Sequence, residues 1–161
     1  IIGLPGDTIK LKNGIVYVND KPLLQNKVGK FSDMHREGYM ENYDLYEEKN
    51  NQGQRYKILD DTSFNGVLGI SYDGIEPFDV NNTNNYTVPE DKFFVMGDNR
   101  EHSSDSRILD QVGYVPKINL VGKAAMIFLS IEYKSDYFEL LGLRIGKLPN
   151  SFRIRRIGKL L

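Results

Sequence analysis

The sequence predicts a mainly β protein, with an antiparallel β core and a β-rich inserted subdomain. Three observations support this prediction. Asn13-Gly14 lies between two short alternating runs, which is the strongest local signal for a two-residue β-hairpin. Residues 92–96, Lys-Phe-Phe-Val-Met, have the composition of a short buried strand. The other apolar segments are also short, and turn-forming residues separate them.

The first predicted element is the hairpin formed by residues 8–12 and 15–19, and a second turn follows at residues 19–22. Residues 23–52 are polar, charged and rich in Tyr, and they have no clear period. Their acidic side chains are expected to form an acidic face; they include Glu37, Glu41, Asp44, Glu47 and Glu48.

Further short strands are predicted at residues 54–59, 67–72 and 86–88, because Asp-Asp, Asp-Gly and an Asn-rich turn separate these segments. The middle of the chain is therefore interpreted as a β-rich insertion. After the strand at 92–96, the apolar stretch 118–131 is expected to be a core strand with a bend or bulge at its internal Gly122.

The composition excludes several classes of protein. A chain of 161 residues with 40% hydrophobic residues is long enough to bury a core. The net charge of -1 gives no general attraction to nucleic acid. No stretch approaches the roughly 18 apolar residues that a membrane-spanning helix needs, so we expect this chain to be soluble. The absence of cysteine excludes disulfides and thiolate chemistry.

The polar run from Gly97 to Arg107, Gly-Asp-Asn-Arg-Glu-His-Ser-Ser-Asp-Ser-Arg, directly follows the predicted strand at 92–96. Such a run is typical of a solvated loop, because Gly, Asp and Asn favour turns. Four of its charges alternate in sign, however, and internal ion pairs would make the loop rigid enough to position catalytic groups. The alternating charges are Asp98, Arg100, Asp105 and Arg107.

Neither a metal site nor a conventional catalytic triad is expected. The two histidines, His35 and His102, lie far apart in sequence and in no spacing that is typical of zinc sites. The polar run also lacks the ligand pattern of an EF-hand. A triad built from His102 and Asp105 is not expected, since neighbours within one loop rarely reach a common nucleophile.

Three segments together resemble bacterial signal peptidase I. They are Ile-Ile-Gly-Leu-Pro-Gly-Asp at residues 1–7, Met-Gly-Asp-Asn-Arg-Glu-His-Ser-Ser-Asp-Ser-Arg at residues 96–107, and the stretch from Val-Gly-Tyr-Val-Pro to Val-Gly-Lys-Ala at residues 112–124. The block at 97–107 is the most specific of the three, and their order and spacing add to the resemblance. Residues 23–85 match nothing specific.

The resemblance implies a signal-peptidase/LexA-like antiparallel β core, divided along the chain into three parts. Residues 1–20 and 86–143 would form an incomplete catalytic-core domain that lacks its upstream strands. Residues 21–85 would form the inserted variable subdomain, and residues 144–161 a basic amphipathic C-terminal tail.

The resemblance also implies the chemistry: a membrane-anchored serine endopeptidase with a Ser nucleophile and a Lys general base, and with no metal or cofactor. Burial among apolar groups would lower the pKa of such a Lys enough for it to act as a base. By motif match, Ser103 would orient the Lys amine and Gly97 would allow a close backbone approach. The four alternating charges would brace the loop by ion pairing.

In this family the nucleophile and the base would both lie upstream of Ile1. The chain also begins without an initiator Met or a leader, so we expect it to be a fragment. Without nucleophile and base, we expect the fragment to have no peptidase activity by itself.

The implied partners are preprotein signal peptides and a membrane surface. The peptide would bind extended, beside the strand leading into Ile1, with small side chains at an Ala-x-Ala-like cleavage site. The intact enzyme would lie in the bacterial cytoplasmic membrane, with its catalytic domain on the outer, periplasmic side.

The last residues form a basic, partly apolar segment that suits an anionic membrane surface. Its basic residues are Arg144, Lys147, Arg153, Arg155, Arg156 and Lys159, and it contains no acidic residue. The alternatives are a packing tail with solvated charges and a disordered terminus. Nucleic acid is not expected as a partner, since no aromatic stacking platform accompanies the charge.

Two other classes remain open. One is a self-cleaving Ser/Lys repressor-type domain, although such chains carry a DNA-binding helical segment and lack the long insertion. The other is a noncatalytic β-rich binding module, in which residues 98–107 would be purely structural.

Overall fold

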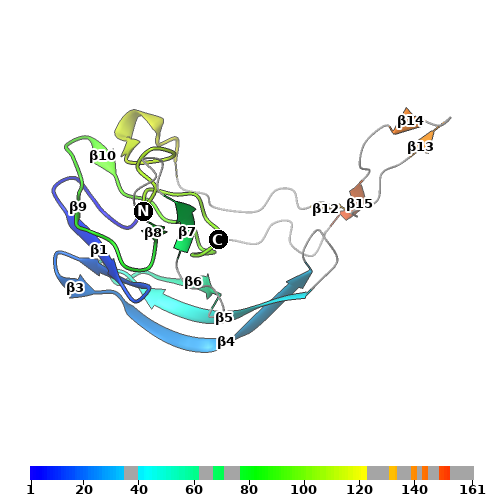
Figure 1. Cartoon of the computed structure of the whole chain (residues 1–161), viewed down its shortest axis with the longest axis horizontal. Coiled ribbons are helices and arrows are strands. Elements are labelled where there is room, and N and C mark those ends of the chain that lie inside the picture. The colour runs from blue at the N-terminus through cyan, green and yellow to red at the C-terminus, as the bar shows by residue number, and fades with distance from the viewer. Residues whose placement is uncertain are drawn as a thin grey trace. The chain divides into compact units, whose positions relative to one another are not determined.

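The computed structural model describes residues 1–34, 40–61, 67–70, 77–122, 131–133, 139–140, 143–144 and 149–152. The chain divides into two compact units, residues 1–120 and 121–161, which are described here one at a time. Antiparallel β-strands form almost all of the regular structure (Figure 1), which confirms the predicted fold class. The division between core domain and inserted subdomain stays a prediction.

The first sheet has the order β3-β2-β1-β9. Its strands are β1 (Thr8–Lys12), β2 (Ile15–Val18), β3 (Lys21–Pro22) and β9 (Tyr86–Thr87). The pairing of Lys12 with Ile15 leaves Asn13-Gly14 as a two-residue turn. Both turn residues have positive φ, 51° and 75°, as a type I′ turn requires. The predicted hairpin is therefore confirmed.

The hydrophobic core of the first unit lies on one face of this sheet. Alternation along β1 directs Ile9 and Leu11 inward while Lys10 stays half-exposed. Phe94 packs into the same cluster, with its ring centroid 5.1 Å from that of Tyr86 and 6.2 Å from that of Tyr114. The buried members are Ile9, Leu11, Val16, Val18, Leu23, Tyr86, Val88 and Phe94.

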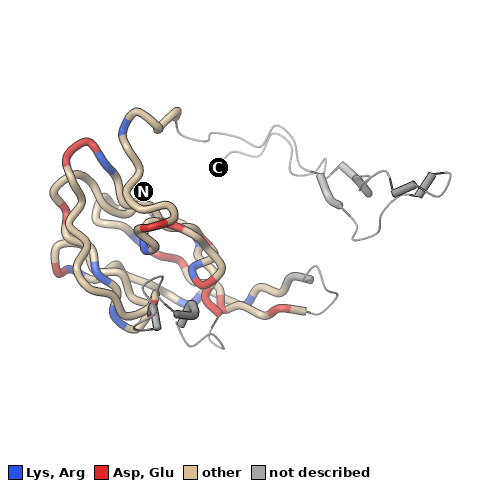
Figure 2. The backbone as a smooth tube through the Cα atoms, turned by 45° about the horizontal axis from the view of Figure 1, so that its top comes forward, with Lys and Arg blue, Asp and Glu red and all other residues tan. Residues whose placement is uncertain are grey.

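The second sheet has the order β4-β5-β6 and contains the long hairpin that the polar composition of residues 23–52 concealed. Its strands are β4 (Leu24–Met34), β5 (Met40–Lys49) and β6 (Arg55–Asp60). Charges of both signs lie along it (Figure 2). Arg55 of β6 forms an ion pair with Glu47 of the neighbouring β5, with Nη1 2.9 Å from Oε1. Lys27 and Asp44 form another ion pair between neighbouring strands. Such cross-strand charge pairs stabilise a sheet without apolar alternation.

Two short strand pairs complete the first unit: β7 (Val67–Ile70) with β8 (Pro77–Asp79), and β10 (Lys92–Phe93) with β11 (Val115–Pro116). The strand predicted at 92–96 is thus shorter than expected. The reason is that the run changes partners, since Phe94 pairs with Gly3 while Val95 exchanges hydrogen bonds with Ser106.

The prediction of a core strand from residue 118 is wrong for its first part. Lys117–Asn119 forms a 3₁₀ turn, η1, closed by a hydrogen bond from Leu120 N to Lys117 O. Ile118 is 91% exposed and Val121 is also exposed. The turn breaks the strand geometry directly after Pro116, so apolar side chains face outward here. Residues 123–130 of the predicted strand lie outside the described residues, and its last residue, Ile131, begins the strand β12.

The second unit contains two described strand pairs. The strand β12 (Ile131–Tyr133) pairs with β15 (Pro149–Phe152), and β13 (Glu139–Leu140) pairs with β14 (Leu143–Arg144). Most of the basic C-terminal segment, residues 145–148 and 153–161, lies outside the described residues.

The position of Phe94 leads to a stability prediction. Phe94 is fully buried, so Phe94→Ala should lower the free energy of unfolding by about 3–5 kcal/mol through lost burial and a cavity. Phe31→Ala is the matched control, because Phe31 is 41% exposed on the second sheet. Urea unfolding of the 161-residue chain measures both. Equal losses for the two variants would contradict the assigned core.

Candidate active site

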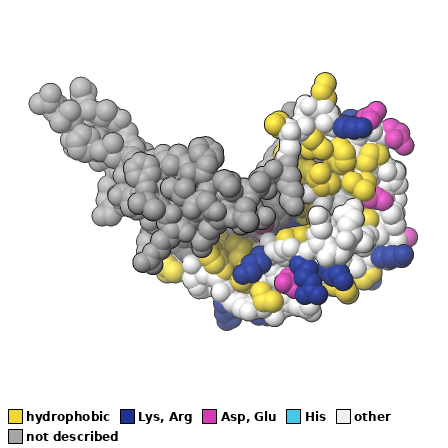
Figure 3. Space-filling view, turned by 180° about the vertical axis from the view of Figure 1, so that it is seen from behind, with side chains coloured by type: hydrophobic (Ala, Val, Ile, Leu, Met, Phe, Trp, Pro, Cys, Tyr) yellow, Lys and Arg dark blue, Asp and Glu magenta, His cyan; other side chains and the backbone are white. Residues whose placement is uncertain are grey.

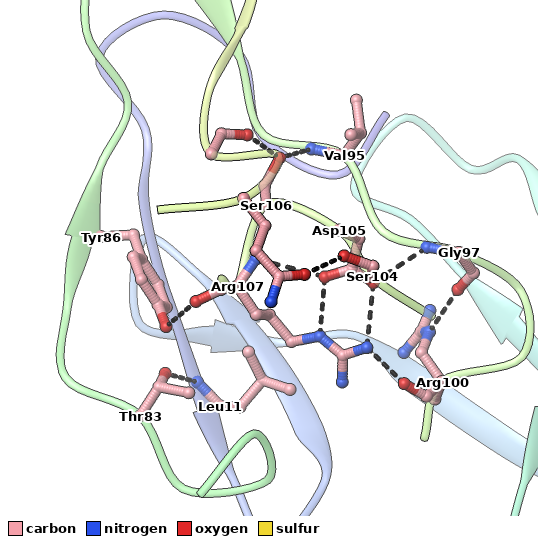
Figure 4. A network of polar contacts seen from close by, with 12 residues as sticks. Leu11, Thr83, Tyr86, Val95, Gly97, Arg100, Ser104, Asp105, Ser106 and Arg107 are labelled. Atoms are coloured by element: carbon pink, nitrogen blue, oxygen red, sulfur yellow. Dashed lines mark hydrogen bonds and ion pairs between the residues drawn. The ribbon is translucent and has the colours of Figure 1, made fainter. Parts of the chain in front are cut away.

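The polar run 97–107 is a folded loop whose ends are joined by Ser106 (Figure 4). Ser106 is fully buried, and its hydroxyl accepts a hydrogen bond from Val95 N at 2.9 Å and donates one to Gly113 O at 2.6 Å. Ser106 N donates in turn to Val95 O at 3.1 Å. These bonds fasten the end of the loop to the chain that leads into it.

Asp105 and Arg107 form a buried two-pronged ion pair inside the loop. Arg107 Nε lies 2.8 Å from Asp105 Oδ1, and Nη2 lies 2.9 Å from Oδ2. Asp105 Oδ2 also accepts a hydrogen bond from Gly97 N at 3.1 Å, and Arg107 Nη2 donates to Arg100 O. Tyr86 of the core donates its hydroxyl to Arg107 O at 2.9 Å. The pair therefore joins the start, middle and end of the loop to the core.

Arg100 and Asp98 do not make the internal ion pairs expected from the sequence. Arg100 is buried and pairs instead with Glu48 of β5, with Nη2 2.5 Å from Oε1 and Nη1 3.1 Å from Oε2. Asp98 is exposed; its carboxylate accepts a hydrogen bond from Asn99 N at 3.0 Å, and it makes no ion pair within the described part of the chain. The loop is therefore braced partly from the second sheet, because the guanidinium of Arg100 points to β5.

Ser103 packs directly against Gly97. A Cβ atom added at Gly97 would lie 2.6 Å from Ser103 Cβ and would overlap the hydroxyl oxygen. Only glycine leaves room for this contact. The structure thus brings together the two residues that the sequence singled out for close approach and for orienting a base.

The serines of the loop differ in how their hydroxyls are used. Ser106 is bonded to the backbone on both sides, and Ser104 donates to Gln111 Oε1 at 2.7 Å. Ser103 is half-buried, and its hydroxyl has no hydrogen-bond partner among the described residues. Of these serines, Ser103 is the one whose hydroxyl is not used inside the described fold.

The N-terminal segment runs antiparallel to the strand that leads into the loop. Gly3 pairs with Phe94, and Ile2 N donates to Phe94 O at 2.8 Å. Gly3 permits this approach, since a Cβ there would lie 2.9 Å from the side chain of Ile9. Ile1 as a residue is 58% exposed, but burial of its amino group lowers the pKa of that amine. The segment therefore enters a partly desolvated place beside the loop.

A cluster of titratable groups lies between the loop and the end of β6. Burial raises the pKa of the Glu101 carboxyl to about 7; the Asp61 amide, 3.0 Å away, opposes the shift and Asp60 adds to it. His102 is exposed, and its Nε2 lies 3.5 Å from Asp61 Oδ2. Its ring meets the Tyr43 ring edge-on at 5.8 Å. Within the described residues, no three His, Asp or Glu side chains are grouped so as to hold a metal ion.

Large apolar side chains are exposed on the first unit, and hydrophobic side chains gather on one face of the described part (Figure 3). The exposed residues include Ile1, Leu4, Leu109, Val112, Ile118 and Leu120. An exposed apolar group of this kind is typical of a surface that contacts a partner or a membrane.

Sequence reasoning missed the contribution of β5 to the site. Glu48 was grouped with the acidic face, yet it is 0% exposed and bonds to the loop. Tyr43 is also buried in β5, although strand alternation would place residues five positions apart on opposite faces. No periodic signal in the sequence marks Glu48, because twist and pairing in the long hairpin decide its environment.

The sequence also matches a known protein family. The model of the family described as "Signal peptidase, peptidase S26" matches residues 1–129. The chain belongs to this family. The matched residues include the hairpin, the second sheet and the loop at 97–107.

Curated relatives, each named signal peptidase I, match almost the whole chain. The protein of Rickettsia canadensis is 35% identical over 167 residues, which is 98% of this chain and 56% of the relative. The Rickettsia rickettsii protein is 36% identical over 161 residues, with the same shares covered. The Rickettsia prowazekii protein is 32% identical over 169 residues, 99% of this chain and 57% of the relative. The chain thus spans little more than half the length of these relatives.

A search of the described residues for a helix both long and apolar enough to cross a membrane finds none.

The contact between Gly97 and Ser103 can be tested by substitution. Gly97→Ala should lower the free energy of unfolding by about 1–3 kcal/mol, because the added methyl group overlaps Ser103 and forces the loop to move. Gly29→Ala is the control, since nothing lies within 4 Å of a Cβ at that position. Chemical denaturation of the 161-residue chain measures the difference. A Gly97→Ala variant as stable as Gly29→Ala would refute the close contact.

The raised pKa of Glu101 predicts a pH dependence of stability. The folded protein holds the Glu101 proton up to about pH 7, whereas the ordinary pKa is 4.5, so stability falls as pH rises from about 4.5 to about 7. Glu101→Gln removes this loss and should make the variant more stable than the wild type by about 1–3 kcal/mol at pH 8.

Unfolding of both proteins at pH 4.5, 6 and 8 tests this, with Glu90→Gln at an exposed position as the control. The difference between wild type and Glu101→Gln should grow with pH, while that for Glu90→Gln should stay constant. A difference that is the same at all three pH values would exclude a proton held on Glu101.

Proposed function

We propose that this chain is the supporting part of a signal peptidase I that removes signal peptides from preproteins. The intact enzyme would use a Ser nucleophile and a Lys general base, both in the part of the protein that precedes Ile1. In this proposal, Ser103 is a supporting catalytic residue that orients the Lys amine, while Gly97 gives it room and the Asp105–Arg107 pair holds its loop. The contact of Ser103 with Gly97 carries the proposal, together with the Ser103 hydroxyl, which has no hydrogen-bond partner among the described residues.

The register of the N-terminal segment supports a base located just before Ile1. Gly3 lies opposite Phe94 in an antiparallel bridge. If this register continued, a residue directly before Ile1 would lie opposite Gly97 and so beside Ser103. The lowered pKa of the Ile1 amine supports a desolvated environment there, and desolvation lowers the pKa of a Lys in the same way.

The same proposal includes the partners of the intact enzyme. A signal peptide would bind as an extended strand near the segment that leads into Ile1, with small residues at the cleavage site. The exposed apolar residues of the first unit would face the membrane or the peptide, and the basic C-terminal segment would face anionic lipid. The enzyme would act on the outer side of the bacterial cytoplasmic membrane.

The test is a pair of serine variants in the intact enzyme. Ser103→Ala should lower kcat for a preprotein by about 100-fold with little loss of stability, because no hydroxyl then holds the amine of the Lys base in its orientation. Ser104→Ala is the control, since Ser104 is exposed and bonds to Gln111. The 161-residue chain alone should show no cleavage of the same preprotein.

Two results would contradict the proposal. Specific cleavage by the 161-residue chain alone would show that nucleophile and base lie within it. Equal rates for Ser103→Ala and wild type would leave Ser103 as a structural residue, as expected of a noncatalytic binding module.

A further inference from the structure

The carboxylate of Glu48 accepts hydrogen bonds from several side chains. Tyr56 donates its hydroxyl to Oε1 at 2.6 Å, and Gln25 donates Nε2–H to Oε2 at 2.8 Å. Gln25, Glu48 and Tyr56 are direct cross-strand neighbours on β4, β5 and β6. Glu48 therefore receives a donor from each strand that flanks it, and its position depends on the correct register of the whole sheet.

The remaining donors to Glu48 come from Arg100 of the loop, 52 positions away in the sequence. Burial by itself would raise the pKa of Glu48, but the hydrogen bonds and charge of Arg100, with Tyr56 and Gln25, outweigh it and lower the pKa. The carboxylate is thus ionised, and both charges are buried. Such a pair costs much desolvation energy unless every donor and acceptor is satisfied, so it is weak evidence for stability and better evidence for a positional role.

Arg100 makes two further bonds within the loop and one to β6. Its Nε lies 3.3 Å from Gly97 O, its backbone N donates to Leu59 O at 3.2 Å, and its carbonyl accepts from Arg107. Leu59 N donates to Asp98 O at 2.8 Å, so residues 98–100 lie beside β6 in a parallel bridge. The start of the loop is therefore attached to the second sheet by backbone and side chain together.

The last step is the contact between Gly97 and Ser103. Arg100 Nε donates to the carbonyl oxygen of Gly97. Ser103 packs against the same glycine so closely that no further atom fits between them. A shift of Arg100 therefore moves the surface on which Ser103 rests. Glu48 is therefore linked to Ser103 by contacts through only two residues, Arg100 and Gly97.

We propose that Glu48 of the second sheet is a positioning residue for the peptidase site, holding Arg100 and through it the Gly97 peptide that supports Ser103. The effect of Glu48 on catalysis rests on the proposed function. The mechanical part, in which Glu48 holds the loop in position, concerns this chain alone. The second sheet is then a part of the active-site scaffold, attached to it through Glu48 and its two cross-strand partners, Gln25 and Tyr56.

The mechanical part is tested by hydrogen exchange on the 161-residue chain. Glu48→Gln keeps the shape of the side chain and removes its charge, so the amides of Leu59, Gly97 and Arg100 should exchange at least about tenfold faster. The amide of Asn19, bonded to Thr8 O in the first sheet, should not change. Glu47→Gln is the matched control, since Glu47 is the next residue and pairs with the exposed Arg55. Equal exchange of the three loop-side amides in both variants would overturn the proposal.

A second variant separates positioning from stability if Glu48→Gln unfolds. The double substitution Glu48→Met and Arg100→Met removes both buried charges together, so that neither charge is left buried without its partner. Gly97 O then still loses its donor, so the Gly97 amide should exchange faster in a folded protein. Unchanged protection at Gly97 in this folded double variant would refute a positioning role.

The catalytic part is tested in the intact enzyme. Glu48→Gln should lower kcat about tenfold with KM nearly unchanged, whereas Glu47→Gln should change neither. Because Glu48 acts through Ser103, Glu48→Gln should cause little further loss in a Ser103→Ala background. Independent, multiplying effects would overturn the catalytic role of Glu48. If Ser103→Ala alone leaves the rate unchanged, the proposed function fails, and the exchange result still decides whether Glu48 holds the loop.

Discussion

The buried ion pair between Asp105 and Arg107 is the interaction on which the geometry of the candidate site depends. One carboxylate bonds to the Arg107 guanidinium, to Gly97 N and to Arg107 N, and one guanidinium bonds to that carboxylate and to Arg100 O. A polar loop without apolar side chains to bury has few other ways to hold a single shape. Because charge-assisted bonds are directional, this pair positions the backbone groups that it bonds, Gly97 N, Arg100 O and Arg107 N.

The loop depends equally on two sheets that have different internal chemistry. The first sheet has an apolar core, and Tyr86 from that core holds Arg107 O. The second sheet is stabilised by polar cross-strand contacts, and its buried Glu48 holds Arg100. The loop therefore joins an apolar layer to a polar one.

Family membership and geometry support different parts of the account. The match over residues 1–129 assigns the chain to the signal peptidase, S26 peptidase family. The geometry adds which serine of the loop has an unused hydroxyl among the described residues and why residue 97 is glycine. The resemblance implied roles for both residues, and the geometry supplies the contact between them. Together they make the role of Ser103 a question that single substitutions can answer.

The sequence by itself determined the features that depend on local chemistry. The Asn13-Gly14 turn followed from the positive φ values that these two residues tolerate, and residues 97–107 were marked by a local motif. Only the tertiary structure decided the burial of Glu48, the exposure of Ile118 and the partner of Arg100. Residues 48 and 100 meet through the pairing of β5 with β6 and of β6 with the loop. Contacts between such distant residues are set by sheet register and twist, which no local pattern of side chains records.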